Sequence, residues 1–218
     1  LLVVLLADLE ISANTFSQIM AIPLSLLVPV LAITSVTSEW SQRTGLVSFT
    51  LEPHRMRVIL AKLVTVVALS VATIALAIAL GAIGNLLYGL MSGNEIVWDI
   101  EAGTFAWVIA QQLLFFVMAF AFGMLILSSP GAIAIYYVVA LLLPALVYGI
   151  LYQAFEWARD IIPWIDLGYA MAPYLRAGDP FVAEQSATTL AQVIVTTLVW
   201  VVVPLVLGAR RVLRAEVK

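Results

Sequence analysis

Long apolar stretches separated by short polar segments dominate the 218-residue chain. Several stretches exceed the roughly 18 apolar residues that predict a membrane-crossing helix. We predict five complete spans, preceded in residues 1–8 by the end of an earlier helix. The complete spans are 15–36, 58–83, 104–127, 132–152 and 188–207. The pattern therefore predicts an all-α fold, a polytopic membrane helix bundle of six transmembrane helices with the first only partly present, in a single transmembrane domain.

Local features refine the predicted spans. The apolar pattern of the second complete span continues to about Met91, which predicts a helix that tilts or extends beyond the membrane. Near its start, Lys62 is expected to reach the lipid head groups. A tight turn is predicted at residues 128–131, which read Ser-Ser-Pro-Gly. Pro144 lies inside the span that follows and predicts a kink there.

Two longer polar segments connect the spans. Residues 37–57 are the most charged part of the chain, and we predict a loop there. Residues 153–186 mix tryptophan, proline, glycine and charged residues, which predicts short interfacial helices rather than a further span. This second segment either forms an outer gate or caps the bundle, and we favour the cap.

Basic residues set the predicted orientation. Eight of the ten lysines and arginines fall on one side if the 37–57 loop and the C-terminal tail share it. By the positive-inside rule this side is cytoplasmic, which also places both chain ends in the cytoplasm and 153–186 outside. The eight residues are Arg43, Arg55, Arg57, Lys62, Arg210, Arg211, Arg214 and Lys218.

Aromatic and small residues add two expectations. Aromatic side chains gather near the predicted span ends, as interfacial belts do; the outer ones are Tyr88, Trp98, Trp107, Tyr152, Trp157, Trp164, Tyr169 and Tyr174, and the inner ones are Trp40, Tyr136 and Tyr137. Small residues at four-residue spacing allow helices to pack closely, either within one bundle or between two copies. These pairs are Ala75 with Ala79, Ala77 with Gly81, and Ala119 with Gly123.

Composition excludes several function classes. Hydrophobic residues make up 64% of the chain and charged residues 11%, against about 25% charged in soluble proteins. Cysteine is absent, which excludes disulfides and thiolate metal sites. Between their ends the spans hold no Asp, Glu, Arg or His, so ion-coupled transport and intramembrane catalysis are disfavoured. His54 is expected to be a solvated loop residue rather than a ligand or base.

Polar side chains inside the spans are few. Gln111 and Gln112 either hydrogen-bond across helices or line a passage for substrate, and we favour the first. A bundle without ionisable groups has no energy source of its own, so we infer that energy arrives from a soluble partner through the 37–57 loop. No G-x-x-x-x-G-K-[ST] motif is present, so this chain is not expected to hydrolyse ATP itself.

The loop has the chemistry of a protein contact. Leu46, Phe49 and Leu51 offer an apolar surface, with charged side chains around it. The alternative is that the basic residues only hold anionic lipid heads, which leaves Phe49 and the acidic residues unexplained. The predicted docking residues are Glu39, Arg43, Thr44, Leu46, Phe49, Leu51, Glu52, Arg55 and Arg57.

Two stretches resemble one family. The sequence EWSQRTGLVSFTLEPHRMRVILAK, residues 39–62, resembles the cytoplasmic loop of actinobacterial ABC-2 type transporter permeases, with a Glu-Trp pair, a threonine-rich segment, a proline and a basic run ending in Ala-Lys. The sequence SSPGAIAIYYVVALLLP, residues 128–144, resembles the inner turn and fifth helix of the same family. Hydropathy is similar over nearly the whole chain, and the motifs cover about 40 residues.

The resemblance implies a half-transporter in the bacterial plasma membrane. It implies a coupling helix within 37–57 that docks on a separate ATP-binding subunit, short re-entrant extracellular helices before the last span, and pairing with a second permease copy. ATP and Mg would be bound by the partner subunit, with no cofactor on this chain and no nucleic acid involved. The expected cargo is a hydrophobic or amphipathic compound moving outward. The alternative is a membrane anchor that tethers a soluble partner and transports nothing.

Overall fold

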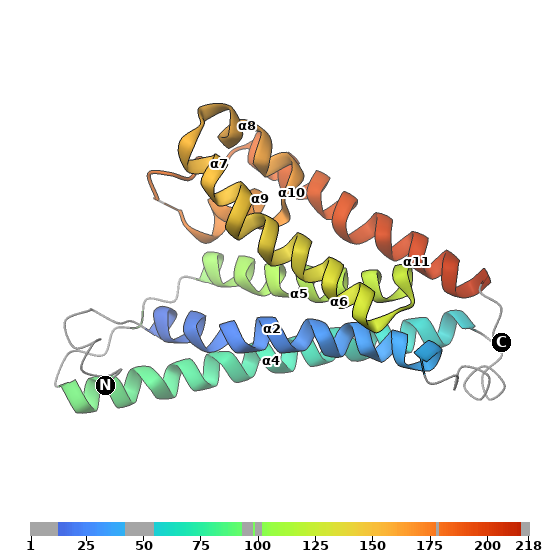
Figure 1. Cartoon of the computed structure of the whole chain (residues 1–218). Coiled ribbons are helices and arrows are strands. Elements are labelled where there is room, and N and C mark those ends of the chain that lie inside the picture. Colours follow the sequence, from blue (N-terminus) through green and yellow to red (C-terminus); the bar gives the residue numbers. More distant parts are fainter. Residues whose placement is uncertain (1–12, 42–54, 93–97, 99–101, 178, 215–218) are drawn as a thin grey trace.

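The computed structural model describes residues 13–41, 55–92, 98, 102–177 and 179–214. These residues form helices and no strand, which confirms the all-α prediction (Figure 1). In chain order the elements are α2 (Ala13–Ser41), α4 (Arg55–Ser92), α5 (Ala102–Ile126), α6 (Ser129–Tyr137), the π-helix η1 (Val138–Tyr148), α7 (Gly149–Ala154), α8 (Glu156–Ile165), α9 (Leu167–Leu175), α10 (Ala187–Thr197), the π-helix η2 (Leu198–Val202) and α11 (Val203–Arg214).

Four helical stretches within the described residues are long and apolar enough to cross a membrane. They are Met56–Met91, Ala102–Ile126, Ser129–Ala154 and Ala187–Arg214. A shorter apolar stretch, Ile22–Ser38, lies within the 29-residue α2. These lengths and compositions support a helical membrane protein. Residues 1–8, predicted as the end of an earlier helix, lie outside the described residues.

The helices extend into the predicted 37–57 loop and past the predicted end of the last span. Residues 37–41 belong to α2 and residues 55–57 to α4, so at most 42–54 connect the two helices. The last helical stretch continues past the predicted end at 207 to Arg214. Since α4 has 38 residues, at about 1.5 Å per residue it is about 57 Å long, far more than a bilayer core of about 30 Å, as the long apolar pattern predicted.

The predicted tight turn is shifted toward the N-terminus. The chain reverses at Leu127 and Ser128, where Leu127 adopts a left-handed conformation with φ of 57° and its N–H donates to the Gly123 carbonyl at 3.0 Å. Residues 129–131, predicted as part of the turn, form the first turn of α6, with Pro130 in it. Proline is favoured there because the first helical N–H groups have no acceptor within the helix.

Several of the described helices pack against α5. In Figure 1, α2 and α4 lie side by side and antiparallel, α5 lies against both, and α11 packs along α5. The last residues of α2, the first residues of α4 and the end of α11 lie at the same end of the bundle (Figure 1). Helices α8 and α9 lie toward the opposite end. The basic residues of α4 and α11 therefore share one end, as the charge pattern predicted.

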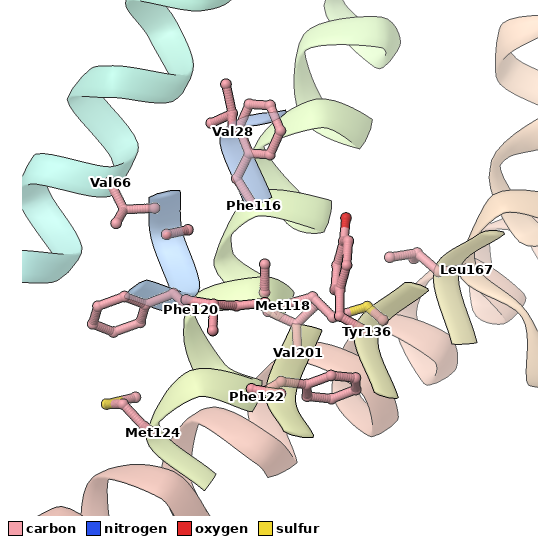
Figure 2. Packing of buried hydrophobic residues seen from close by; sticks show 14 of the residues in the cluster. Val28, Val66, Phe116, Met118, Phe120, Phe122, Met124, Tyr136, Leu167 and Val201 are labelled. Atoms are coloured by element: carbon pink, nitrogen blue, oxygen red, sulfur yellow. The ribbon is translucent and has the colours of Figure 1, made fainter. Parts of the chain in front are cut away.

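Helix α5 is the centre of the core. From Met118 to Met124 its side chains are buried in succession, so this part of the helix is enclosed on every face (Figure 2). Gly123 allows α2 to approach, because a Cβ at this position would lie 3.2 Å from the Cα and from the carbonyl oxygen of Ile33. The Ala119–Gly123 pair thus packs within the bundle.

Helix α4 has one inward stripe and a broad outward face. Ala77 is buried and Gly81 lies on the same stripe, whereas Ala75 and Ala79 are exposed on the other side of the helix. Ala77 and Gly81 therefore pack within the chain, whereas Ala75 and Ala79 face outward together with exposed leucines and valines. For Ala75 and Ala79, pairing between two copies stays a prediction.

Hydrogen bonds between helices stabilise the end of the bundle near the 37–57 segment. The Lys62 ammonium donates to the Ser35 carbonyl of α2 at 2.8 Å. Lys62 was predicted to reach the lipid head groups, and in the structure it reaches a neighbouring helix instead. The hydroxyls of Thr37 and Ser129 lie 2.6 Å apart and join α2 to α6. The expected kink at Pro144 appears as a change of helix type, since this proline lies inside the π-helix η1.

Candidate membrane groove

A groove of about 460 Å³ lies between α2, α5, the α6–η1 stretch and α9. Its walls are mostly apolar and include Phe115 and Phe116 of α5 and Ala140 and Leu141 of η1. Small-molecule sites commonly have about 300–1,000 Å³ and apolar walls with a few polar groups, so this groove has the dimensions of a ligand site. The lining residues are Ile22, Ser25, Leu26, Val108, Gln111, Gln112, Phe115, Phe116, Tyr136, Tyr137, Ala140, Leu141, Gly168, Ala172, Leu175 and Arg176.

The two glutamines predicted from the sequence meet in this groove. Gln111 and Gln112 are both half-buried on its α5 wall. Neither carboxamide hydrogen-bonds another group of the chain among the residues that the structure describes. The cross-helix hydrogen bond that we favoured is therefore not formed there, and the position of the two side chains agrees with the alternative, a lining role.

Two tyrosines of α6 border the groove. Tyr136 is buried in the core and packs edge-on against Phe122, with ring centroids 6.5 Å apart (Figure 2). The Tyr137 hydroxyl donates to the Leu26 carbonyl and thereby joins α6 to α2. Tyr136 was predicted to lie in an inner aromatic belt, and this prediction is wrong, because its ring is enclosed by protein instead of facing lipid head groups.

A second cavity of about 310 Å³ continues the groove along η1. It shares Phe115, Ala140 and Leu141 with the groove and adds Asp166 and Tyr169 at the junction of α8 and α9. The Trp200 indole N–H of η2 donates to the Ile165 carbonyl at 2.7 Å, which fixes this junction against the last helical stretch. The groove therefore extends toward the short helices that follow α7.

Asp166 is a buried acid that the sequence did not single out. It is 6% exposed and forms the N-cap of α9, where its Oδ1 accepts a hydrogen bond from the Tyr169 N–H at 2.9 Å. Burial raises the pKa of the Asp166 carboxyl, and hydrogen bonds from the backbone N–H groups of Tyr169 and Gly168 offset part of that rise. The one available signal was an aspartate directly before an apolar run, which is typical of a helix N-cap.

Replacing Asp166 by asparagine tests this environment. Since the folded state raises the pKa, ionisation favours unfolding, and the cost is absent at low pH, develops as the pH rises through the shifted pKa, and is complete above it. Asparagine caps helices about as well without a charge. We expect Asp166→Asn to melt at a higher temperature than the parent at pH 7, and the two to converge below about pH 4. A lower melting temperature at pH 7 would show that the carboxylate charge stabilises the fold.

The 153–186 segment contains the predicted short helices. Within it α9 is largely buried, and Tyr174 stacks on Trp107 of α5 with ring centroids 4.1 Å apart. The Tyr174 hydroxyl also lies 3.1 Å from the Thr189 hydroxyl of α10. The segment is thus packed onto the bundle, which agrees with a cap. Trp157 and Trp164 of α8 stay exposed, as expected of an interfacial helix, whereas Trp107 and Tyr174 face each other rather than lipid.

Of the nine predicted docking residues, the structure describes the side chain of Arg57 alone. Arg57 is exposed near the start of α4, and Arg55 is the first residue of that helix. The side chains outside the description are those of Glu39, Arg43, Thr44, Leu46, Phe49, Leu51, Glu52 and Arg55. Among the described residues, no group of three or more His, Cys, Asp or Glu side chains could hold a metal ion.

Comparisons with family models, with curated proteins and with solved structures find no match for this chain.

Proposed function

We propose that the chain is the membrane-spanning permease subunit of an ATP-binding-cassette transporter of the ABC-2 type. In this proposal a separate ATPase docks on the 37–57 segment, and the bundle exports a hydrophobic or amphipathic compound. The observation that carries the proposal is the motif of residues 39–62, EWSQRTGLVSFTLEPHRMRVILAK, which resembles the family's cytoplasmic loop and joins two long helices that pack on each other.

The described helices supply a path from that segment to the groove. Helix α2 ends at Ser41, where the connection begins, and its residues Ile22 and Leu26 form one wall of the groove. Ser41 lies 15 residues after Leu26, which is an axial rise of about 22 Å. The Lys62–Ser35 hydrogen bond joins α2 to α4 near the connection. A displacement of the connection by ATP-driven closure of the partner would thus move the groove wall directly.

The lack of charged side chains in two of the described membrane-crossing stretches supports an external energy source. Within the described parts of α5 and of the Ser129–Ala154 stretch, no side chain is ionised at neutral pH, so neither helix carries a group that could bind and release a coupling proton. A membrane anchor shares the loop but has no use for the groove. An ATPase activity of the reconstituted complex that rises when an amphipathic compound is added would favour the permease over the anchor.

The orientation of the connection tests the proposal. Because the chain has no cysteine, a single introduced cysteine reports one position without background. We expect Ser48→Cys to react with a membrane-impermeant maleimide only after cells are permeabilised, and Asn94→Cys, in the next polar segment, to react in intact cells. Labelling of Ser48→Cys from outside intact cells would place the segment beyond the reach of a cytoplasmic ATPase and end the proposal.

A further inference from the structure

We propose that the groove between α2, α5, η1 and α9 binds an uncharged amphipath whose head group carries hydroxyl or amide groups. The inference deepens the proposed function, on which it rests only in treating the bound molecule as cargo. Three features of the groove carry it: unpartnered carboxamides from α5, a carbonyl acceptor from α2, and the charged residues in and beside its lining.

The α5 wall offers two carboxamides. Gln111 and Gln112 are adjacent, half-buried and without a hydrogen-bond partner among the described residues. Each carboxamide has two N–H donors and a carbonyl acceptor. In apolar surroundings such groups are costly unless they are hydrogen-bonded, so a ligand with its own donors and acceptors is favoured over a hydrocarbon, which would leave both glutamines without partners.

The α2 wall offers an acceptor. Pro29 has no N–H, so the carbonyl of Ser25, four residues earlier, loses its donor within the helix. Ser25 lines the groove, and its own hydroxyl is engaged with the Ile22 carbonyl at 2.8 Å. A hydroxyl or amide N–H of a ligand can therefore donate to this wall while the glutamines bind the same head group from α5.

Charge disfavours an ionic head group. Of the residues that line the groove, Arg176 is the charged one, and its guanidinium lies 3.8 Å from the Asp179 carboxylate. An anion would have to compete with Asp179 for this arginine and would approach the buried Asp166 of the adjoining cavity. A cation would face Arg176 itself. A neutral head meets neither penalty, and the apolar side chains of the walls and of the adjoining cavity accommodate its tail.

Photo-crosslinking tests the proposal on the whole chain in lipid nanodiscs without ATP or a partner. Three probes share one alkyl chain carrying a diazirine and differ in the head: a glucoside, a carboxylate and a trimethylammonium. We expect saturable crosslinks of the glucoside probe to peptides from 104–127 and 132–152, competed by unlabelled octyl glucoside. The two ionic probes are expected to crosslink there at about one tenth of that level.

Glutamine variants test the polar contacts. Gln111→Leu combined with Gln112→Leu is expected to raise the half-saturating concentration of the glucoside probe about tenfold, through the loss of its hydrogen bonds. Gln153→Leu makes the same chemical change on an exposed position of α7, away from the groove, and should leave binding unchanged. Leucine is well tolerated in a membrane helix, and a single Gln112→Leu variant serves if the double variant fails to assemble.

Three results would overturn the site: labelling that does not saturate and spreads over the outward faces, equal labelling by all three head groups, or unchanged binding in the double leucine variant. Each leaves the docking of an ATPase unaffected, because this experiment contains none. Conversely, failure of ATPase docking would leave the binding result standing, so the two proposals can fail separately.

Discussion

Gly208→Ala is expected to destabilise the protein by about 1–3 kcal/mol, the usual cost of forcing extra atoms into a packed interior. Gly208 lies where α11 crosses α5. A Cβ at this position would lie 2.8 Å from the Met124 Cβ, 3.0 Å from the Leu125 nitrogen and 3.1 Å from the Ala121 carbonyl oxygen. Two of these contacts are backbone atoms, so no side-chain rotation relieves them. Helix α11 would have to move away from α5.

The displacement would also disturb the end of α5. The Arg211 guanidinium, one turn after Gly208, donates to the Leu125 carbonyl in the last turn of that helix. This carbonyl is among those without a partner inside the helix, and a cation near a helix C-terminus is favourable. We therefore expect Gly208→Leu, which adds more atoms at the same place, to prevent assembly of the folded bundle.

Gly103→Ala is the matched control. A Cβ at Gly103 meets nothing within 4 Å, and the residue lies in the first turn of α5. Here alanine is expected to stabilise the helix by up to about 1 kcal/mol, since glycine is the poorer helix former. Thermal unfolding in detergent should thus shift in opposite directions for the two substitutions. Equal shifts would show that the close approach of α11 to α5 does not govern stability.

The sequence predicted where helices begin and end better than how they pack. The predicted spans 104–127 and 132–152 differ by only a few residues from Ala102–Ile126 and Ser129–Ala154, because a bilayer requires a minimum apolar length and turn residues interrupt it. By contrast, the contact of Gly208 was not predicted. The residues four positions away are Pro204 and Val212, so no small-residue pair marked it.

Lateral packing is hard to predict for a physical reason. Spans such as α5 are apolar on every face, so the period of hydrophobic residues does not identify the inward face. For the same reason the groove was not predicted. It forms only where α2, α5, η1 and α9 come together, and only then do Gln111 and Gln112 line one cavity. Asp166 was missed because a single acid in a polar segment is usually solvated.

The most direct test of an ATPase-driven permease is the loss of a bound ATPase when the predicted docking surface is removed. Within that predicted surface, Phe49 is the aromatic residue and Glu52 is an acidic residue. Truncating such an anchor commonly costs about 2 kcal/mol or more, which is roughly 30-fold in affinity. The chain, purified from the membranes of the cells that naturally produce it, should carry ATP hydrolysis into the eluate.

We expect Phe49→Ala with Glu52→Ala to lower the ATP hydrolysis recovered per mole of chain by about 30-fold, while the yield and thermal unfolding of the chain stay unchanged. Gln42→Ala with Ser48→Ala, which changes two residues outside the predicted docking set in the same segment, is the control and should retain the activity. Recovery of the full ATP hydrolysis with the Phe49 and Glu52 double variant would contradict the account.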